Sequence, residues 1–314
     1  MKKAKKIQMN VSNRMTFEEG CKEYLDNCRA RNLRDGTIRH YTDTITQLYK
    51  YIDREMFIEE ITMDVYDQFI RALRSNEAMN DMTLYTYGRD LKTLLYYFMR
   101  QEYMPSFKIQ LAKSDKQPIE TYTDEELRKM LKKPNLKQCT FHEYKSWVIV
   151  NFLLSTGIRQ NSLVNIKIKD IDFDNEVVYV NMTKNRKPLI VPLNNDILKI
   201  LNEYLRYRHH ESKEEYLFCN IFGKQLKRST VYHGLCQYNR SRGVETTGMH
   251  RFRHTFAKKW VTMGGNVVTL SKVLGHSSIA ITENYLNMLT CDLKKDIDKF
   301  NILHEFKKES IKMK

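Results

Sequence analysis

The sequence predicts a mainly α-helical protein with one small antiparallel sheet, divided into a helical amino-terminal domain and a mixed carboxy-terminal domain. Three observations lead to this fold class. Apolar residues recur at helical spacing throughout residues 16–100. Short runs rich in β-branched and aromatic residues occur only between positions 171 and 192. A chain of 314 residues is also long enough for two hydrophobic cores, because single domains usually span about 100 to 200 residues.

The first domain is expected to contain four amphipathic helices over residues 15–101, after a flexible basic tail at 1–14. Turn and capping residues at Asp35-Gly36, Thr62 and Asn80-Asp81 are expected to separate these helices. The apolar positions of the four helices are, in order, Phe17, Cys21, Tyr24, Leu25 and Cys28; Tyr41, Ile45, Leu48 and Ile52; Val65, Phe69, Ile70 and Leu73; Leu84, Tyr87, Leu91, Leu94, Leu95 and Phe98.

A linker is expected over residues 102–120, where the helical periodicity stops. The segment contains Pro105 and Pro118 and several lysines, among them Lys108, Lys113 and Lys116. Such a basic connection is typically exposed to solvent, and it is also suited to lie along a phosphate backbone.

The second domain is expected over residues 121–306, with a second basic tail at 307–314. Thr123 is placed to cap a helix that has acidic residues in its first turn. A long apolar helix at 147–155 should end at Gly157, and three antiparallel strands are expected at 171–173, 176–182 and 189–192. From Asn194 onward the pattern is again helical.

The charge, cysteine content and apolar runs of the sequence narrow the class of protein and its partners. The 53 Lys and Arg residues against 38 Asp and Glu give a net charge of +15, which favours a polyanionic partner such as nucleic acid. Charge alone leaves an unrelated basic protein equally open. The six cysteines form no CxxC pair, which indicates a reducing cytoplasm. No apolar run is long enough for a membrane span, and the basic start lacks the apolar stretch of a signal peptide.

Four short segments of the second domain carry side chains suited to chemistry. Arg159 follows Gly157 at the start of a helix, and Lys184 lies in a cationic turn between two strands, although Lys187 could be argued for the same role. The other two segments are the run from His250 to His254, which includes Arg253, and Leu274-Gly275-His276-Ser277-Ser278, followed by Tyr285. Taken singly, each is better explained as a buried arginine, solvated turn charges or a core tyrosine.

Together the four segments form a set suited to a phosphodiester: two guanidiniums, an ammonium, several imidazoles and a phenol. Arginines neutralise the charge that grows on phosphate oxygens in the transition state, and a phenol is a nucleophile once its proton is removed. A metal site at the pair His250 and His254 is disfavoured, because no acidic or cysteine ligand lies nearby and Arg253 would repel a dication.

The order Arg, Lys, His-x-x-Arg, Leu-Gly-His, Tyr resembles the tyrosine recombinase (phage integrase) family over nearly the whole chain, and the strings HxxRHTFA and LGHSS are specific in combination. The resemblance implies Tyr285 as nucleophile, Arg159 and Arg253 as the phosphate clamp, and Lys184 as general acid. It implies His250 and His276 as proton-transfer or hydrogen-bonding groups. The chain departs from the family at Arg251 and at Gln160-Asn161-Ser162.

The same resemblance implies a C-shaped DNA clamp made of a SAM-like core-binding domain and a catalytic domain. It implies cleavage and rejoining of double-stranded DNA at a recombination site through a 3'-phosphotyrosine, without cofactor, metal or ATP, for integration or excision of a mobile element. The implied partners are a homotetramer on DNA and, as an open point, accessory DNA-bending proteins; no membrane partner is expected. A helix at 292–306 could dock on a neighbouring subunit or on its own domain.

Two alternatives stay open at this point. A type IB topoisomerase shares the active-site chemistry but does not exchange DNA partners. A DNA-binding regulator without catalysis would use the helix-turn-helix rhythm of residues 268–286, with Gly275 at the turn. The regulator leaves Arg159, Lys184 and the His250 segment without a role.

Overall fold

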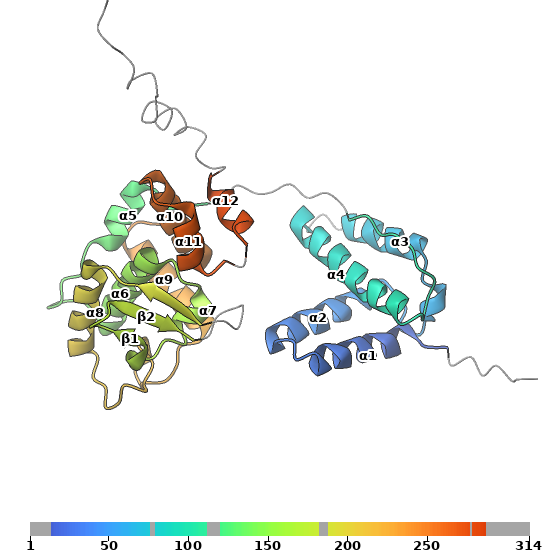
Figure 1. The fold of residues 1–314 in the computed structure, drawn as a ribbon, viewed down its shortest axis with the longest axis horizontal. Helices are drawn as coiled ribbons and strands as arrows, with labels where there is room; N and C mark the ends of the chain where they lie inside the picture. Colours follow the sequence, from blue (N-terminus) through green and yellow to red (C-terminus); the bar gives the residue numbers. More distant parts are fainter. Residues whose placement is uncertain (1–13, 76–78, 112–119, 182–187, 277, 287–314) are drawn as a thin grey trace, which may run out of the picture. The chain divides into compact units, whose positions relative to one another are not determined.

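The computed structural model describes residues 14–75, 79–111, 120–181, 188–276 and 278–286. The chain divides into two compact units, Met1–Gln117 and Pro118–Lys314, and the division falls inside the expected linker. The described residues form mainly helices and one three-stranded antiparallel sheet, so the predicted fold class is confirmed (Figure 1). None of the described helices combines the length and the apolar character that a membrane span requires.

The described residues of the first unit form four α-helices and a short 3-10 helix. They are α1 (Phe17–Ala30), α2 (Asp35–Leu48), η1 (Ile58–Glu60), α3 (Met63–Arg74) and α4 (Asp81–Arg100). Their apolar faces enclose one core that includes the fully buried Phe17, Leu91 and Phe98. The helical periodicity of this half therefore predicted its elements well, since only one face of each helix is buried.

Local residues set where these helices begin. The side chains of Thr16 and Asn80 accept hydrogen bonds from the backbone N–H groups of Glu19 and Thr83, which caps α1 and α4. Thr62 precedes α3 but makes no side-chain cap. The expectation that Asp35 and Gly36 separate two helices is wrong, because both residues lie in the first turn of α2.

The start of the expected linker packs on the first unit. Met104 and Ile109 are buried in its core. The Nζ of Lys92 donates to the backbone carbonyl of Ile109 at 2.7 Å, and the hydroxyl of Tyr96 accepts from the N–H of Ile109 at 3.3 Å. Residues 104–109 therefore extend this core beyond the last helix.

The second unit is built around α6 (Phe141–Thr156), which packs against α5, α8, α9 and α10. Ten of the sixteen residues of α6 are buried, which explains why its sequence reads as an apolar run without a polar face. Its helices are α5 (Asp124–Leu131), α6, α7 (Gln160–Leu163), η2 (Ile168–Asp170), α8 (Asn195–Tyr207), α9 (Arg228–Ser241), α10 (Met249–Thr262), α11 (Val267–Leu274) and α12 (Ala280–Leu286).

The sheet has the order β1 (Ile171–Asp172), β2 (Val177–Val180) and β3 (Leu189–Pro192), with both pairs antiparallel. The register pairs Val178 with Ile171 on one side and with Val191 on the other. Val178 and Val191 are fully buried, whereas Tyr179 and Ile190 on the other face are exposed. This alternation is that of a sheet with one face on the core.

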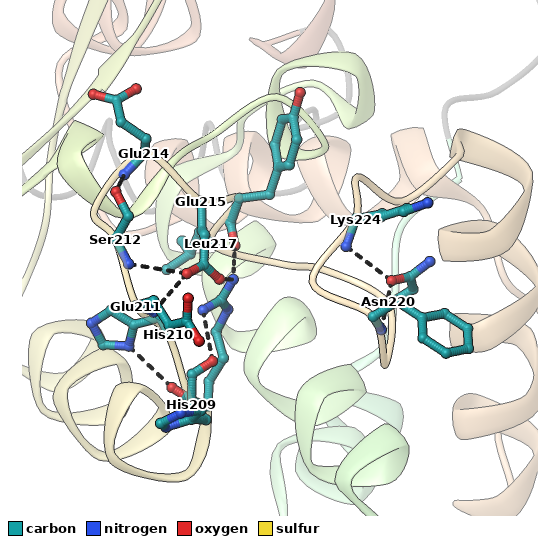
Figure 2. A network of polar contacts seen from close by, with 12 residues as sticks. His209, His210, Glu211, Ser212, Glu214, Glu215, Leu217, Asn220 and Lys224 are labelled. Atoms are coloured by element: carbon teal, nitrogen blue, oxygen red, sulfur yellow. Dashed lines mark hydrogen bonds and ion pairs between the residues drawn. The ribbon is translucent and has the colours of Figure 1, made fainter.

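The helical pattern predicted from Asn194 onward is interrupted, because residues 208–227 form an irregular loop. Arg208 is almost fully buried at the end of α8, and its guanidinium donates to the carbonyls of His209 and Tyr216 and to the carboxylate of Glu215. Glu215 also accepts from the N–H groups of Glu211 and Ser212, which lowers its pKa to about 2 (Figure 2). These side-chain bonds satisfy the backbone in place of helical ones.

The last described elements follow α10. Helix α11 ends at Gly275, which has a φ of +60°, and α12 follows and packs on both α10 and α11 (Figure 1). The expected helix at 292–306, the cationic turn with Lys184 and both basic tails, except Arg14, lie outside the described residues. The C-shaped clamp stays a prediction.

Candidate active site

The site forms where five helices of the second unit meet: the end of α6, the start of α7, the middle of α10 and the pair α11 and α12. Helix α6 ends at Gly157, which has a left-handed φ of +60°. A Cβ at this position would lie 2.5 Å from Phe256 and 2.8 Å from Leu274. Only glycine meets both requirements, and it brings the end of α6 against α10 and α11.

Arg253 joins the ends of α6 and α11 from its position on α10. Its two terminal nitrogens donate to the carbonyls of Gly157 and Leu274, each at 2.8 Å, and the residue is only 4% exposed. Burial, together with the nearby charge of Arg159, lowers the pKa of Arg253 to about 10. The guanidinium therefore stays charged at neutral pH and is held by two carbonyl dipoles.

Arg159 lies at the amino-terminal end of α7 and supplies the second guanidinium. Its contact with the carbonyl of Leu274 is long, at 3.5 Å, so the group is not fully held by protein acceptors. Burial lowers the pKa of Arg159 as well. Neither Arg159 nor Arg253 pairs with a carboxylate among the described residues, so this corner of the unit has an uncompensated positive charge.

His276 follows the left-handed Gly275, which turns the chain out of α11. The Nδ1 of His276 and the hydroxyl of Thr282 lie 2.7 Å apart, and Thr282 is fully buried. Burial lowers the pKa of His276 to about 4, with further contributions from Arg253 and Arg159. The imidazole is therefore neutral at pH 7 and can act as a hydrogen-bonding group without adding charge.

Tyr285 points from α12 into this cluster and is 3% exposed. Its hydroxyl lies 2.9 Å from the Nδ1 of His254 on α10, and its ring is nearly parallel to that of His276 at a centroid distance of 6.5 Å. Burial raises the pKa of the phenol, while Arg253 and Arg159 act in the opposite direction. The phenol therefore keeps its proton at neutral pH.

The structure brings together five of the six predicted residues: Arg159, His250, Arg253, His276 and Tyr285. His250 lies at the exposed edge, with its ring 6.1 Å from that of His254. Lys184, the sixth, lies outside the described residues. Sequence reasoning did not assign a role to His254, although it lies on the same helical face as His250, four residues away.

The described residues contain no group of three or more His, Cys, Asp or Glu side chains that could hold a metal ion. What the cluster offers is two guanidiniums that can bind phosphate oxygens, with a phenol and neutral imidazoles beside them. A phosphate can be bound by the planar forks of both arginines, and the phenol oxygen is then within reach of the same charges.

The comparisons with known proteins agree with this geometry. Residues 120–290 match the phage integrase family, and residues 16–115 match the phage integrase SAM-like domain. Tyrosine recombinase XerA of Saccharolobus solfataricus is 26% identical over 268 residues, which cover 83% of this chain and 86% of XerA. Tyrosine recombinase XerC of Staphylococcus epidermidis is 26% identical over 276 residues, covering 84% and 90%.

Solved structures share the fold. The Tn1549 transposon integrase, in complex with a circular intermediate DNA, superposes with a TM-score of 0.70 at 20% identity, covering 85% of this chain and 94% of the integrase. A lambda integrase dimer bound to a COC' core site gives a TM-score of 0.69 at 17% identity, covering 86% and 95%. Neither the regulator nor the topoisomerase alternative is favoured by these relatives. The family match covers more than half of the chain, and the protein therefore belongs to the phage integrase family of tyrosine recombinases.

Proposed function

We propose that this site-specific tyrosine recombinase cleaves and rejoins DNA with Tyr285 as the nucleophile. The observation that carries the assignment is the position of the phenol, which is buried in a cluster whose two guanidiniums have no carboxylate partner among the described residues. A scissile phosphate supplies the missing negative charge. Once it binds, the charges of Arg159 and Arg253 are shared between the phosphate and the phenol oxygen that attacks it.

In the cleavage step, the Tyr285 oxygen forms a bond to phosphorus, its proton passes to solvent at the exposed edge where His250 lies, and the bond from phosphorus to the 5' oxygen breaks. The leaving 5' oxygen takes up a proton and becomes a hydroxyl. Arg159 and Arg253 neutralise the nonbridging oxygens during the step. In the reverse direction, the 5'-hydroxyl of a partner strand attacks the 3'-phosphotyrosine, so the energy of the broken bond is conserved and ATP is not needed.

Lys184 is proposed to protonate the leaving 5' oxygen. Lys184 lies in the chain between the end of β2 at Val180 and the start of β3 at Leu189, and these two residues pair in the sheet. The side chain of Leu189 lies 3.1 Å from the position that a Cβ at Gly275 would occupy, and His276 is the next residue. The strand ends that flank Lys184 therefore lie close to the site. His276 is proposed to hydrogen-bond a nonbridging oxygen, and His250 is proposed to contribute to proton transfer at the exposed edge.

The proposed partner is double-stranded DNA, bound by a homotetramer of this chain. The support is a structural neighbour, a lambda integrase tetramer bound to a Holliday junction, which superposes with a TM-score of 0.69 at 16% identity. Action on a mobile element is supported by the Tn1549 transposon integrase among the neighbours. The net charge of +15 suits a partner with a dense phosphate backbone.

Covalent capture tests the proposal. The protein is incubated in EDTA with a pool of labelled, nicked duplexes prepared from the genome that encodes it, and adducts are resolved on a denaturing gel. We expect an adduct with the wild type and with Tyr232→Phe, a control at an exposed tyrosine of α9, and none with Tyr285→Phe. An adduct that persists in Tyr285→Phe would identify a different nucleophile. DNA binding without any adduct would favour the regulator, and a strict metal requirement would contradict the mechanism.

A further inference from the structure

The hydroxyl of Tyr285 has a hydrogen-bond partner to which the proposed mechanism gives no role. His254 directly follows Arg253 on α10, and its Nδ1 lies 2.9 Å from the phenol oxygen. The two rings are 5.7 Å apart and inclined by 50°, so the contact is made edge to edge through polar atoms and not by stacking. The residues are 31 positions apart in the sequence, and only the packing of α12 on α10 brings them together.

His276 and Arg253 also lie beside the phenol, but neither offers it an acceptor in the way that His254 does. The Nδ1 of His276 is bonded to the hydroxyl of Thr282, although the ring of His276 lies parallel to that of Tyr285. The terminal nitrogens of Arg253 donate to the carbonyls of Gly157 and Leu274. Arg253 also hydrogen-bonds the Tyr285 phenol, but a guanidinium can only donate, so it cannot accept the phenol proton. Among the described residues, His254 therefore provides the uncharged acceptor that faces the phenol.

The direction of the bond follows from the charge state of both partners. Burial, together with the charges of His250 and Arg253, lowers the pKa of His254 to about 4. His254 is therefore neutral at pH 7, whereas the Tyr285 phenol retains its proton. The phenol donates, Nδ1 accepts, and the imidazole proton is on Nε2.

We propose, on the basis of the function proposed above, that His254 is a positioning residue that holds the Tyr285 oxygen by accepting its hydrogen bond, and so sets the line of attack on the phosphate. A phenol ring on the short helix α12 can rotate about its side-chain bonds. The bond to α10, the helix that also carries Arg253, keeps the nucleophile and the phosphate-binding guanidinium in one rigid frame. His254 acts through Tyr285 and is not the group that protonates the leaving oxygen.

The proposal predicts a defect confined to the attack of the phenol. His254→Leu removes the acceptor with a side chain of similar bulk, and a misplacement of the nucleophile by about 1 Å commonly lowers a rate about 100-fold. On a duplex that forms an adduct with the wild type, we expect the single-turnover rate of adduct formation by His254→Leu to be about 10-fold to 100-fold lower. His254→Asn places an amide oxygen near the position of Nδ1, and we expect its rate to stay within about threefold of the wild type. The equilibrium binding of the duplex should be unchanged in both variants.

A second substrate separates positioning of the nucleophile from protonation of the leaving group. A duplex with sulfur in place of the 5' bridging oxygen releases a thiolate, which needs no proton to depart. We expect the sulfur substrate to restore cleavage by Lys184→Ala and to leave the defect of His254→Leu unchanged. If His254→Leu melts below the assay temperature, His254→Gln serves instead, because its amide lies near the position of Nε2 and away from that of Nδ1.

Three results would overturn the inference: a wild-type rate in His254→Leu, rescue of His254→Leu by the sulfur substrate, or equal rate losses in His254→Asn and His254→Leu. The last result would assign His254 a merely structural role. A failure of the proposed function would look different from these three results. It would appear as an adduct that persists in Tyr285→Phe, whatever the His254 variants do. A loss in His254→Leu, recovery in His254→Asn and no rescue by sulfur would together support the positioning role.

Discussion

Replacing Arg253 by lysine separates the geometric role of the guanidinium from its charge. Arg253 donates to the carbonyls of Gly157 and Leu274 at 2.8 Å from two different nitrogens. A lysine ammonium is a point charge on a flexible stem and cannot bridge both carbonyls while also binding a phosphate. The variant keeps the positive charge but loses at least one of the two hydrogen bonds.

The size of the effect follows from these contacts. A hydrogen bond to a charged group contributes about 1.5–3 kcal/mol, so we expect Arg253→Lys to lower the free energy of unfolding by about 2 kcal/mol. Removing one fixed donor from the transition state typically lowers the rate about 100-fold to 1000-fold. Adduct formation on a nicked duplex should therefore fall by that factor, in a single-turnover assay run beside urea denaturation.

Arg251→Lys is the matched control on the same helix. Arg251 pairs with Glu120 and donates to Thr246, outside the site. The Arg251 side chain is 13% exposed but that of Glu120 is 73% exposed, and an ion pair that water reaches on one side contributes about 0–1 kcal/mol. We expect it to change neither stability nor cleavage by much. If Arg253→Lys cleaved DNA as fast as Arg251→Lys, the assignment of Arg253 to the phosphate clamp would be refuted.

Three further predictions concern stability. Gly157→Ala should lower the free energy of unfolding by roughly 2–5 kcal/mol, because Gly157 has a left-handed φ and the added Cβ would overlap with Phe256 and Leu274. Gly243 has a φ of +71° but open space around it, so Gly243→Ala should lower it by only about 1–2 kcal/mol. Equal melting temperatures of the two variants would contradict this prediction. Asp90→Asn should cost about 1–3 kcal/mol, because the buried carboxylate binds Arg89, His40 and Thr44, and a thermal melt that matches the wild type would refute it. The pKa values of His254 and His276 are lowered from 6.5 to about 4 in the folded protein, so as the pH drops the unfolded chain takes up protons first. The free energy of unfolding should therefore fall between about pH 6.5 and about pH 4. Urea denaturation across that range should show a smaller fall for His254→Asn than for the wild type.

Much of the fold was determined by local sequence. The helices of the first unit follow from apolar residues spaced for one buried face, and the three strands follow from β-branched runs with turn residues between them. The capping box at Thr123 and the stop at Gly157 were also predictable, because each depends on residues adjacent in the chain. The set Arg159, His250, Arg253, His276 and Tyr285 could be predicted because its order and spacing resemble one family.

Other features depend on contacts between distant residues, and only the tertiary structure decided them. The buried guanidinium of Arg208 and the carboxylate of Glu215 end the helical pattern after α8, and no periodicity signals such a network. Met104 and Ile109 join the first core, although their segment has the composition of a linker. The neutral state of His254 and its bond to Tyr285 arise from burial beside Arg253 and from the packing of α12 on α10. Burial, charge and hydrogen bonding between helices depend on three-dimensional distance, and the sequence by itself specifies that distance only within one helix, strand or turn.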